Sequence, residues 1–195
     1  MRKYDIEKAI QETGLLKVQE ALENGLRKDQ LYKELEEGHI EKVAHGIYSK
    51  KGEWVDEMKL LNIRCPDAVF SHEEALFYYG LIDREPQQRV ITIYTGYNPS
   101  RLKKDGVKVY TVKKELLDIG KIIINNEWNN TIPIYDLERT MCDLVRSRSS
   151  FEKDEFKNAL QRYAKRQDKN LTHLMDYAKQ FRIDRIMREY MEVLL

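Results

Sequence analysis

Apolar residues in the first third of the chain recur at helical spacing and predict three short helices, over residues 4–13, 17–23 and 27–37. Gly14 follows the first predicted helix and Gly38 follows the third, and glycine commonly ends a helix in this way. The chain therefore opens with a compact helical unit.

Two short β-prone segments come next, residues 39–43 and 46–49, and a loop over residues 50–52 closes the pair. The order helix, helix, turn, helix, hairpin predicts a winged helix-turn-helix domain over residues 1–52. In that fold the second helix crosses the DNA backbone, the third faces the base edges of the major groove, and the hairpin reaches nearby phosphates. A protein-interaction version of the same fold is the alternative.

A mixed pattern begins at residue 53 and predicts a second domain over residues 53–195. The predicted elements are helices at 54–62 and 71–79, strands at 89–95, 107–112 and 121–124, and helices at 135–149, 151–168, 171–179 and 183–195. Ser71 and Glu74 have the spacing of a capping box at the start of the second of these helices. The predicted fold class is therefore α+β: a winged helix-turn-helix followed by a mixed α/β domain that ends in a helical bundle.

Composition narrows the class further. The chain has 195 residues, of which 42% are hydrophobic and 34% charged, and this composition excludes collagen-like and disordered proteins. Cys65 and Cys142 are too few for a disulfide scaffold and lack the spacing of a zinc site. The N-terminal residues contain no apolar leader, and no apolar run approaches the ~20 residues of a membrane span. We therefore expect a cytoplasmic protein that does not enter a membrane.

The whole chain has a net charge of only +1, but binding to a polyanion depends on local charge. The first domain contains candidate DNA contacts for this reason. Acidic side chains weaken the case for the third helix, but its cations Arg27 and Lys28 stand at the N-terminal end, which such motifs insert most deeply. The predicted DNA-binding residues are Lys17, Arg27, Lys28, Gln30, Lys33, Lys42, His45, Lys50 and Lys51.

A second basic region lies near the C-terminus, where residues 139–188 contain 13 Lys and Arg against seven Asp and Glu. Helical spacing puts several of these cations opposite an apolar face of the predicted helix at 151–168. This possible second basic patch comprises Arg146, Arg148, Lys153, Lys157, Arg162, Lys165, Arg166 and Lys169. It either contacts nucleic-acid phosphates or is an ordinary solvated face.

Catalytic motifs are missing from the sequence. The nine glycines form no phosphate-binding loop, the four histidines are scattered, and no serine lies in a G-x-S-x-G elbow. Cys142 lies in a predicted helix, where a small buried hydrophobe is more typical than a nucleophile. Arg139 and Asp143 are one helical step apart, a pairing that more often fixes helix orientation than performs catalysis. We expect no enzymatic activity, no metal and no cofactor.

Three segments, taken in order, resemble the landmarks of AbiEi-like antitoxins of bacterial abortive-infection, type IV toxin–antitoxin systems. They are GHIEKVAHGIY at residues 38–48, FSHEEALFYYGL at 70–81 and IPIYDLERTMCD at 132–143. By this resemblance, residues 27–37 would be the recognition helix and residues 42–51 the wing. The chain departs from such helices at the start, where Arg27 and Lys28 replace the usual small hydroxyl residue.

The resemblance implies a transcriptional autorepressor that binds inverted repeats of double-stranded DNA in its own promoter. We expect a monomer in solution that pairs on DNA. It also implies a C-terminal domain that antagonises a nucleotidyltransferase-like toxin without a stable complex. Two alternatives stay open: a C-terminal domain that acts enzymatically on the toxin or on RNA, and an interaction module that titrates the toxin directly.

Overall fold

A computed structural model describes residues 4–195 and divides the chain into two compact units, with the boundary between Asp56 and Glu57. The sequence pattern had suggested a boundary four residues earlier. Helices and strands are present in both units, which confirms the α+β class. None of the helices in the described range has the length and apolar character needed to cross a membrane.

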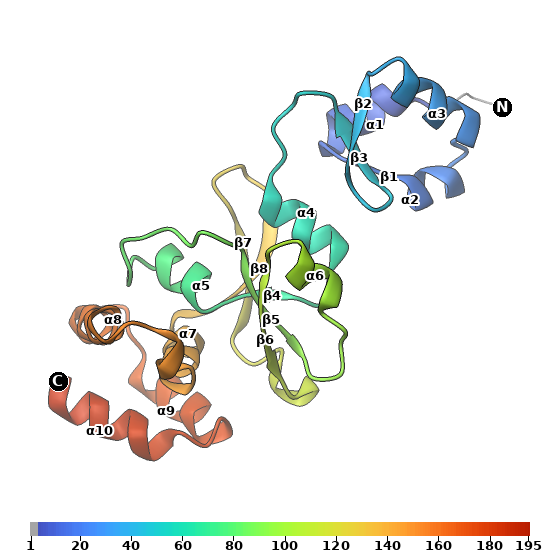
Figure 1. The fold of residues 1–195 in the computed structure, drawn as a ribbon. Coiled ribbons are helices and arrows are strands. Elements are labelled where there is room, and N and C mark those ends of the chain that lie inside the picture. The colour runs from blue at the N-terminus through green and yellow to red at the C-terminus, as the bar shows by residue number, and fades with distance from the viewer. Residues whose placement is uncertain (1–3) are drawn as a thin grey trace. The chain divides into compact units, whose positions relative to one another are not determined.

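The N-terminal unit contains three helices and a three-stranded antiparallel sheet (Figure 1). Its elements are α1 (Ile6–Thr13), β1 (Leu16–Lys17), α2 (Val18–Glu23), α3 (Lys28–Glu36), β2 (Ile40–Ala44) and β3 (Ile47–Lys50). The strands are ordered β1-β3-β2. The three predicted helices and the predicted hairpin are therefore present, and β1 is an additional strand that the periodicity did not reveal.

Apolar side chains from every helix close the core of this unit. The buried residues are Ile6, Ile10, Leu16, Ala21, Leu26, Leu31 and Ile40. The carboxylate of Asp5 accepts a hydrogen bond from the backbone N–H of Lys8 and so caps the start of α1. At the other end, Gly14 has a φ of 75°, which a glycine adopts without strain.

The C-terminal unit contains a five-stranded mixed sheet with the order β6-β5-β4-β8-β7. Its elements are α4 (Glu57–Arg64), β4 (Val69–Phe70), α5 (Glu73–Tyr78), β5 (Val90–Tyr94), α6 (Ser100–Lys104), β6 (Lys108–Val112), η1 (Lys114–Leu116), β7 (Lys121–Asn125), β8 (Thr131–Tyr135), α7 (Leu137–Arg146), η2 (Arg148–Ser150), α8 (Lys153–Lys165), α9 (Leu171–Gln180) and α10 (Asp184–Leu194). Strand β4 pairs parallel to β8 and antiparallel to β5, and β5 pairs parallel to β6.

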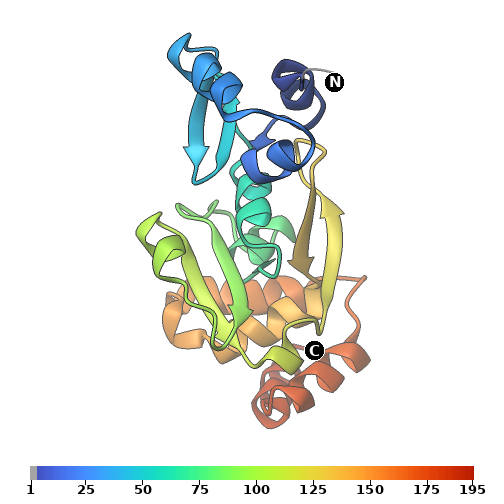
Figure 2. The same ribbon diagram turned by 90° about the vertical axis from the view of Figure 1, so that its right-hand side faces the viewer.

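The helices cover both faces of this sheet (Figures 1 and 2). On one face α4 and α6 pack against strand residues such as Phe70, Ile91 and Ile134. On the other face α5 and α7–α10 form a second core around Met141, Leu160 and neighbouring apolar residues. The helical bundle predicted at the end of the chain is thus one layer of the C-terminal unit.

Candidate functional site

The start of α3 holds the predicted contacts of the recognition helix. The guanidinium of Arg27 forms a two-pronged ion pair with Asp29, and its Nε lies 3.0 Å from the carboxylate. The half-buried Gln30 accepts a hydrogen bond from the backbone N–H of Arg27 at 3.1 Å, so an amide side chain fixes the helix start that lacks a small hydroxyl cap. Lys28 is exposed and has no ion pair within residues 4–195. Its charge is therefore fully available at this end of the helix.

Three other predicted contacts of this unit form exposed ion pairs with neighbours along the chain. Lys17 lies 3.5 Å from Glu20, Lys33 lies 3.7 Å from Glu37, and Lys50 lies 3.0 Å from Glu53. Exposed ion pairs contribute little to stability because water competes with both partners. A phosphate group can therefore displace the carboxylate at low cost.

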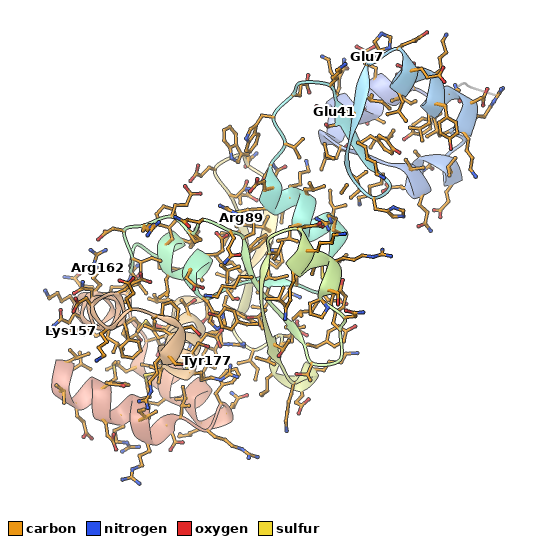
Figure 3. The ribbon with its side chains drawn as sticks, in the orientation of Figure 1. Glu7, Glu41, Arg89, Lys157, Arg162 and Tyr177 are labelled. Atoms are coloured by element: carbon orange, nitrogen blue, oxygen red, sulfur yellow. The ribbon has the colours of Figure 1, made fainter. Side chains whose placement is uncertain are left out.

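The β2–β3 hairpin and the loop directly after it carry the remaining predicted contacts, Lys42, His45 and Lys51. All three are exposed, and the described part of the chain offers none of them an ion pair. The loop after β3 is held in place, because the carboxylate of Glu41 accepts a hydrogen bond from the backbone N–H of Gly52 at 2.8 Å (Figure 3). The hairpin thus presents unpaired positive charge on a fixed backbone.

Three side chains at the end of α3 each offer one atom that could bind a metal ion, and these atoms lie within 4.8 Å of one another. They belong to the half-buried Glu34 and the exposed Glu37 and His39. Nδ1 of His39 lies 2.9 Å from a carboxylate oxygen of Glu34. A hydrogen bond within the group accounts for this arrangement.

The proposed second basic patch separates into two sets. Four of its members are held by the protein. Arg162 on α8 forms a two-pronged ion pair with Asp83 and donates to the carbonyl of Gly80 (Figure 3). Arg166 donates to Tyr79 O at 2.8 Å and pairs with Asp168, while Lys169 donates to Arg166 O. These side chains fix loops.

The fourth held residue, Arg146, lies 3.0 Å from Asp143, and its guanidinium lies over the ring of Phe181. The other four, Arg148, Lys153, Lys157 and Lys165, are exposed and have no ion pair among residues 4–195. These four side chains can meet a phosphate without first losing a partner in the described chain.

Arg139 and Asp143 form the ion pair expected from their spacing. Both side chains are fully buried, and Nε of Arg139 lies 3.1 Å from the carboxylate. The guanidinium also donates to the carbonyls of Leu116 and Ile119, and it lies between the rings of Tyr135 and Phe181. Because Arg139 ties α7 to the segment before β7, its role here is structural.

Cys142 on the same helix is fully buried, and its thiol donates to Leu174 O at 3.8 Å. Burial raises the pKa of this thiol well above its usual value. A protonated, enclosed thiol is a poor nucleophile, in keeping with the interpretation of Cys142 as a core residue.

A buried polar network surrounds His72. Sequence reasoning did not find it. The ring of His72 stacks on Tyr110 with centroids 3.5 Å apart, and its nitrogens lie 3.0 Å from Ser71 Oγ and 3.2 Å from Ser147 Oγ. His72 also has a φ of 52°, a conformation that side-chain residues rarely adopt. Burial lowers its pKa to about 4, so the ring is neutral at physiological pH.

The capping box predicted at Ser71 and Glu74 is wrong. The hydroxyl of Ser71 pairs with Thr92 Oγ1 at 2.8 Å instead of capping α5, which begins at Glu73. The carboxylate of Glu74 accepts from the backbone N–H of Val90 at 3.3 Å instead of reaching back. Contacts with β5 therefore take both side chains away from the helix start.

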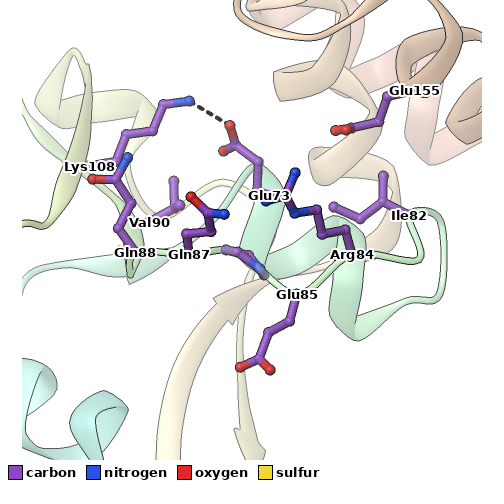
Figure 4. Close-up of a pocket in the computed structure, with 10 residues that line it drawn as sticks. Glu73, Ile82, Arg84, Glu85, Gln87, Gln88, Val90, Lys108 and Glu155 are labelled. Atoms are coloured by element: carbon purple, nitrogen blue, oxygen red, sulfur yellow. Dashed lines mark hydrogen bonds and ion pairs between the residues drawn. The ribbon is translucent and has the colours of Figure 1, made fainter.

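A small pocket of about 210 Å³ lies between α5 and the segments around it (Figure 4). Its lining residues are Glu73, Ile82, Arg84, Glu85, Pro86, Gln87, Gln88, Val90, Lys108 and Glu155. The residues come from α5, the loop before β5, the start of β5, β6 and α8. Sequence reasoning identified none of them as a site residue, since no motif connects these five segments.

Comparison with known proteins finds a similar fold but no similar sequence. No protein-family model matches the chain, and no curated protein matches its sequence. Among solved structures, the chain is similar to the RV2827C protein from Mycobacterium tuberculosis, with a TM-score of 0.61 and 13% sequence identity. The match covers 88% of this chain and 69% of that chain. The two proteins therefore share their fold over most of the chain described here.

Proposed function

We propose that the N-terminal unit is a winged helix-turn-helix that binds double-stranded DNA. The observation that carries this proposal is the element order α1-β1-α2-α3-β2-β3 together with the strand order β1-β3-β2. In this assignment α3 is the recognition helix and the β2–β3 hairpin is the wing. The start of α3 is the part that such motifs bring closest to the bases.

The exposed lysines suit contacts with phosphates, whereas Arg27 and Gln30 at the start of α3 suit contacts with bases. Lys28 at the start of α3, Lys42 on the hairpin and Lys51 directly after it are exposed and have no ion pair in the described chain, so they can meet phosphates without first breaking a bond. Arg27 and Gln30 lie close to the same end of α3 and supply the hydrogen-bonding groups that suit base edges. Phosphate contacts set the position, and the contacts of α3 set the sequence preference.

We further propose that the whole protein is the antitoxin of a type IV toxin–antitoxin operon and represses its own promoter at inverted repeats. Support comes from the three segments that resemble AbiEi-like antitoxins. Residues 38–48 include β2 and the start of β3, residues 70–81 include the end of β4 and all of α5, and residues 132–143 include most of β8 and the first part of α7. The resemblance thus extends over both units. Two copies would bind one operator, one on each half-site.

Repression is tested with a reporter driven by the DNA upstream of the protein's own gene. We expect the intact protein to lower reporter output and the double variant Arg27→Ala with Lys28→Ala to relieve most of that repression. Lys8→Ala is the matched control, because Lys8 is an exposed cation of α1 in the same unit. Equal repression by all three proteins would refute the assignment of α3.

The antitoxin role is tested by expressing the neighbouring toxin gene with and without this protein. We expect co-expression to restore growth, and we expect the two purified proteins to elute separately on size exclusion. Failure to restore growth would remove the antitoxin role. A stable complex would instead favour direct titration of the toxin.

A further inference from the structure

The pocket beside α5 is small for a binding site. Its volume of about 210 Å³ lies below the roughly 300–1,000 Å³ of sites for drug-sized ligands. A nucleotide is too large for it, while a metabolite of amino-acid size fits.

Three of the charged side chains that line the pocket, Glu73, Lys108 and Glu85, form ion pairs within the protein. Lys108 Nζ lies 2.5 Å from Glu73 Oε1, the contact drawn as a dashed line in Figure 4. Glu85 accepts from Arg89 at 3.2 Å. These two carboxylates therefore add little net charge to the space.

Two further lining residues keep opposite charges without a partner. Arg84 and Glu155 form no ion pair within residues 4–195, and both lie on the side of the pocket away from Lys108 (Figure 4). Burial, and after it the nearby Glu73 and Glu152, raises the pKa of Glu155. The nearby cations Arg84 and Lys108 lower the same pKa, but the effect of burial outweighs theirs. The pocket thus offers one cation and one anion.

Glu73 adds an unsatisfied acceptor. Its second carboxylate oxygen, Oε2, is buried and has no hydrogen-bond partner. Because this oxygen is closed to solvent, a ligand in the pocket does not reach it, and Glu73 contributes to the wall. The amides of Gln87 and Gln88, also in the lining, can both donate and accept.

We propose that this pocket binds a small zwitterion with the charge pattern of a free α-amino acid. The ligand's ammonium group donates to Glu155, and its carboxylate accepts from the guanidinium of Arg84. The apolar walls formed by Ile82, Pro86 and Val90 contact its side chain. This site is separate from the DNA-binding role proposed for the N-terminal unit.

Other ligand classes fit less well. A polyamine would meet the uncompensated positive charge of Arg84, and inorganic phosphate would meet Glu155 and Glu73. Both are useful probes because each carries only one sign of charge.

The test is calorimetric titration of the full-length protein with each of the twenty common L-amino acids, up to about 10 mM. We expect saturable binding of at least one. The N-acetyl and the carboxamide derivatives of that amino acid, each lacking one charge, should bind at least roughly tenfold more weakly.

Variants assign the binding to this pocket. Arg84→Gln and Glu155→Gln should each weaken the amino acid roughly tenfold or more. Arg84→Gln should also abolish the preference for the amino acid over its carboxamide, a readout that general destabilisation does not produce. Glu152→Gln, an exposed change at the start of α8, is the matched control and should bind normally.

Three results would overturn the proposal. They are no saturable binding of any of the twenty amino acids, binding that Arg84→Gln and Glu155→Gln leave unchanged, and binding of putrescine or phosphate in place of the amino acids. Circular dichroism of each variant establishes that it is folded before titration.

Discussion

Replacing Arg139 by alanine is expected to unfold the C-terminal unit at a much lower temperature. The guanidinium is fully buried, pairs with the equally buried Asp143 at 3.1 Å and donates to two backbone carbonyls. In Arg139→Ala the carboxylate of Asp143 stays buried and keeps only Arg146, whose side chain is 28% exposed. A buried charge is left largely uncompensated.

The size of the loss follows from the burial of both partners. Removing one partner of a buried ion pair costs about 3–5 kcal/mol, because the remaining charge has lost its compensation. For a domain the size of the C-terminal unit, that cost corresponds to a fall in melting temperature on the order of 10 °C. Removing both charges together, as Arg139→Met with Asp143→Leu, should recover most of the loss, since apolar pairs replace buried ion pairs well.

Thermal unfolding followed by circular dichroism measures the effect. Arg185→Ala is the control, because Arg185 also pairs with an acidic neighbour one helical turn away but is 93% exposed. We expect its melting temperature to stay close to that of the wild type. If Arg139→Ala melted no earlier than Arg185→Ala, the structural role assigned to the buried pair would be wrong.

Two other predictions concern the same unit. Gly120→Ala should lower the free energy of unfolding by about 1–3 kcal/mol more than Gly106→Ala does, and its melting temperature should be correspondingly lower. Both glycines have positive φ, but an added Cβ would lie 2.5 Å from Arg139 Cβ only at Gly120, so equal losses would contradict that close approach. Burial raises the pKa of Glu74 to about 7, so its contribution to stability is lost as the pH rises from about 4.5 to 7. His72, whose pKa falls to about 4, contributes the opposite slope, with stability lost as the pH falls from about 6.5 to 4. Glu74→Gln should therefore steepen the gain in unfolding free energy between about pH 5 and about pH 7 in urea titrations, and an unchanged slope would refute this.

Local spacing was enough to predict the helices of the N-terminal unit and the hairpin, because each buries one regular face. It was not enough for β1. That strand has two residues, and pairing with β3 defines it, with Leu16 opposite Tyr48. A contact between residues so far apart leaves no periodic signal in either segment.

The same physical reason explains the error at Ser71 and Glu74. The spacing of a capping box was present, but pairing of the hydroxyl with Thr92 on β5 outcompeted the helix amide. Spacing also placed Arg162 and Arg166 on one polar arc of the predicted helix at 151–168, and it gave no sign that Asp83 and Tyr79 O would hold them. Tertiary contacts decided which of the exposed cations remained free.

The buried network and the pocket were beyond sequence reasoning. His72, Tyr110 and Ser147 come from three separate segments, and their contacts exist only after the sheet and helices have packed. Glu73 and Lys108 also meet only in the folded unit. With a single sequence, no motif connects such residues.

The central claim is that the start of α3 and the β2–β3 hairpin bind DNA, and a salt titration of the full-length protein tests it most directly. The protein's own upstream DNA is compared with a scrambled sequence, for the wild type, for the triple variant Lys28→Ala, Lys42→Ala and Lys51→Ala, and for Lys8→Ala. We predict about a thousandfold preference for the upstream DNA. In the triple variant the salt slope should fall by about 0.9 for each lost phosphate contact, while Lys8→Ala should leave it unchanged. Equal affinity for the two DNAs, or a slope that the triple variant does not alter, would contradict the account.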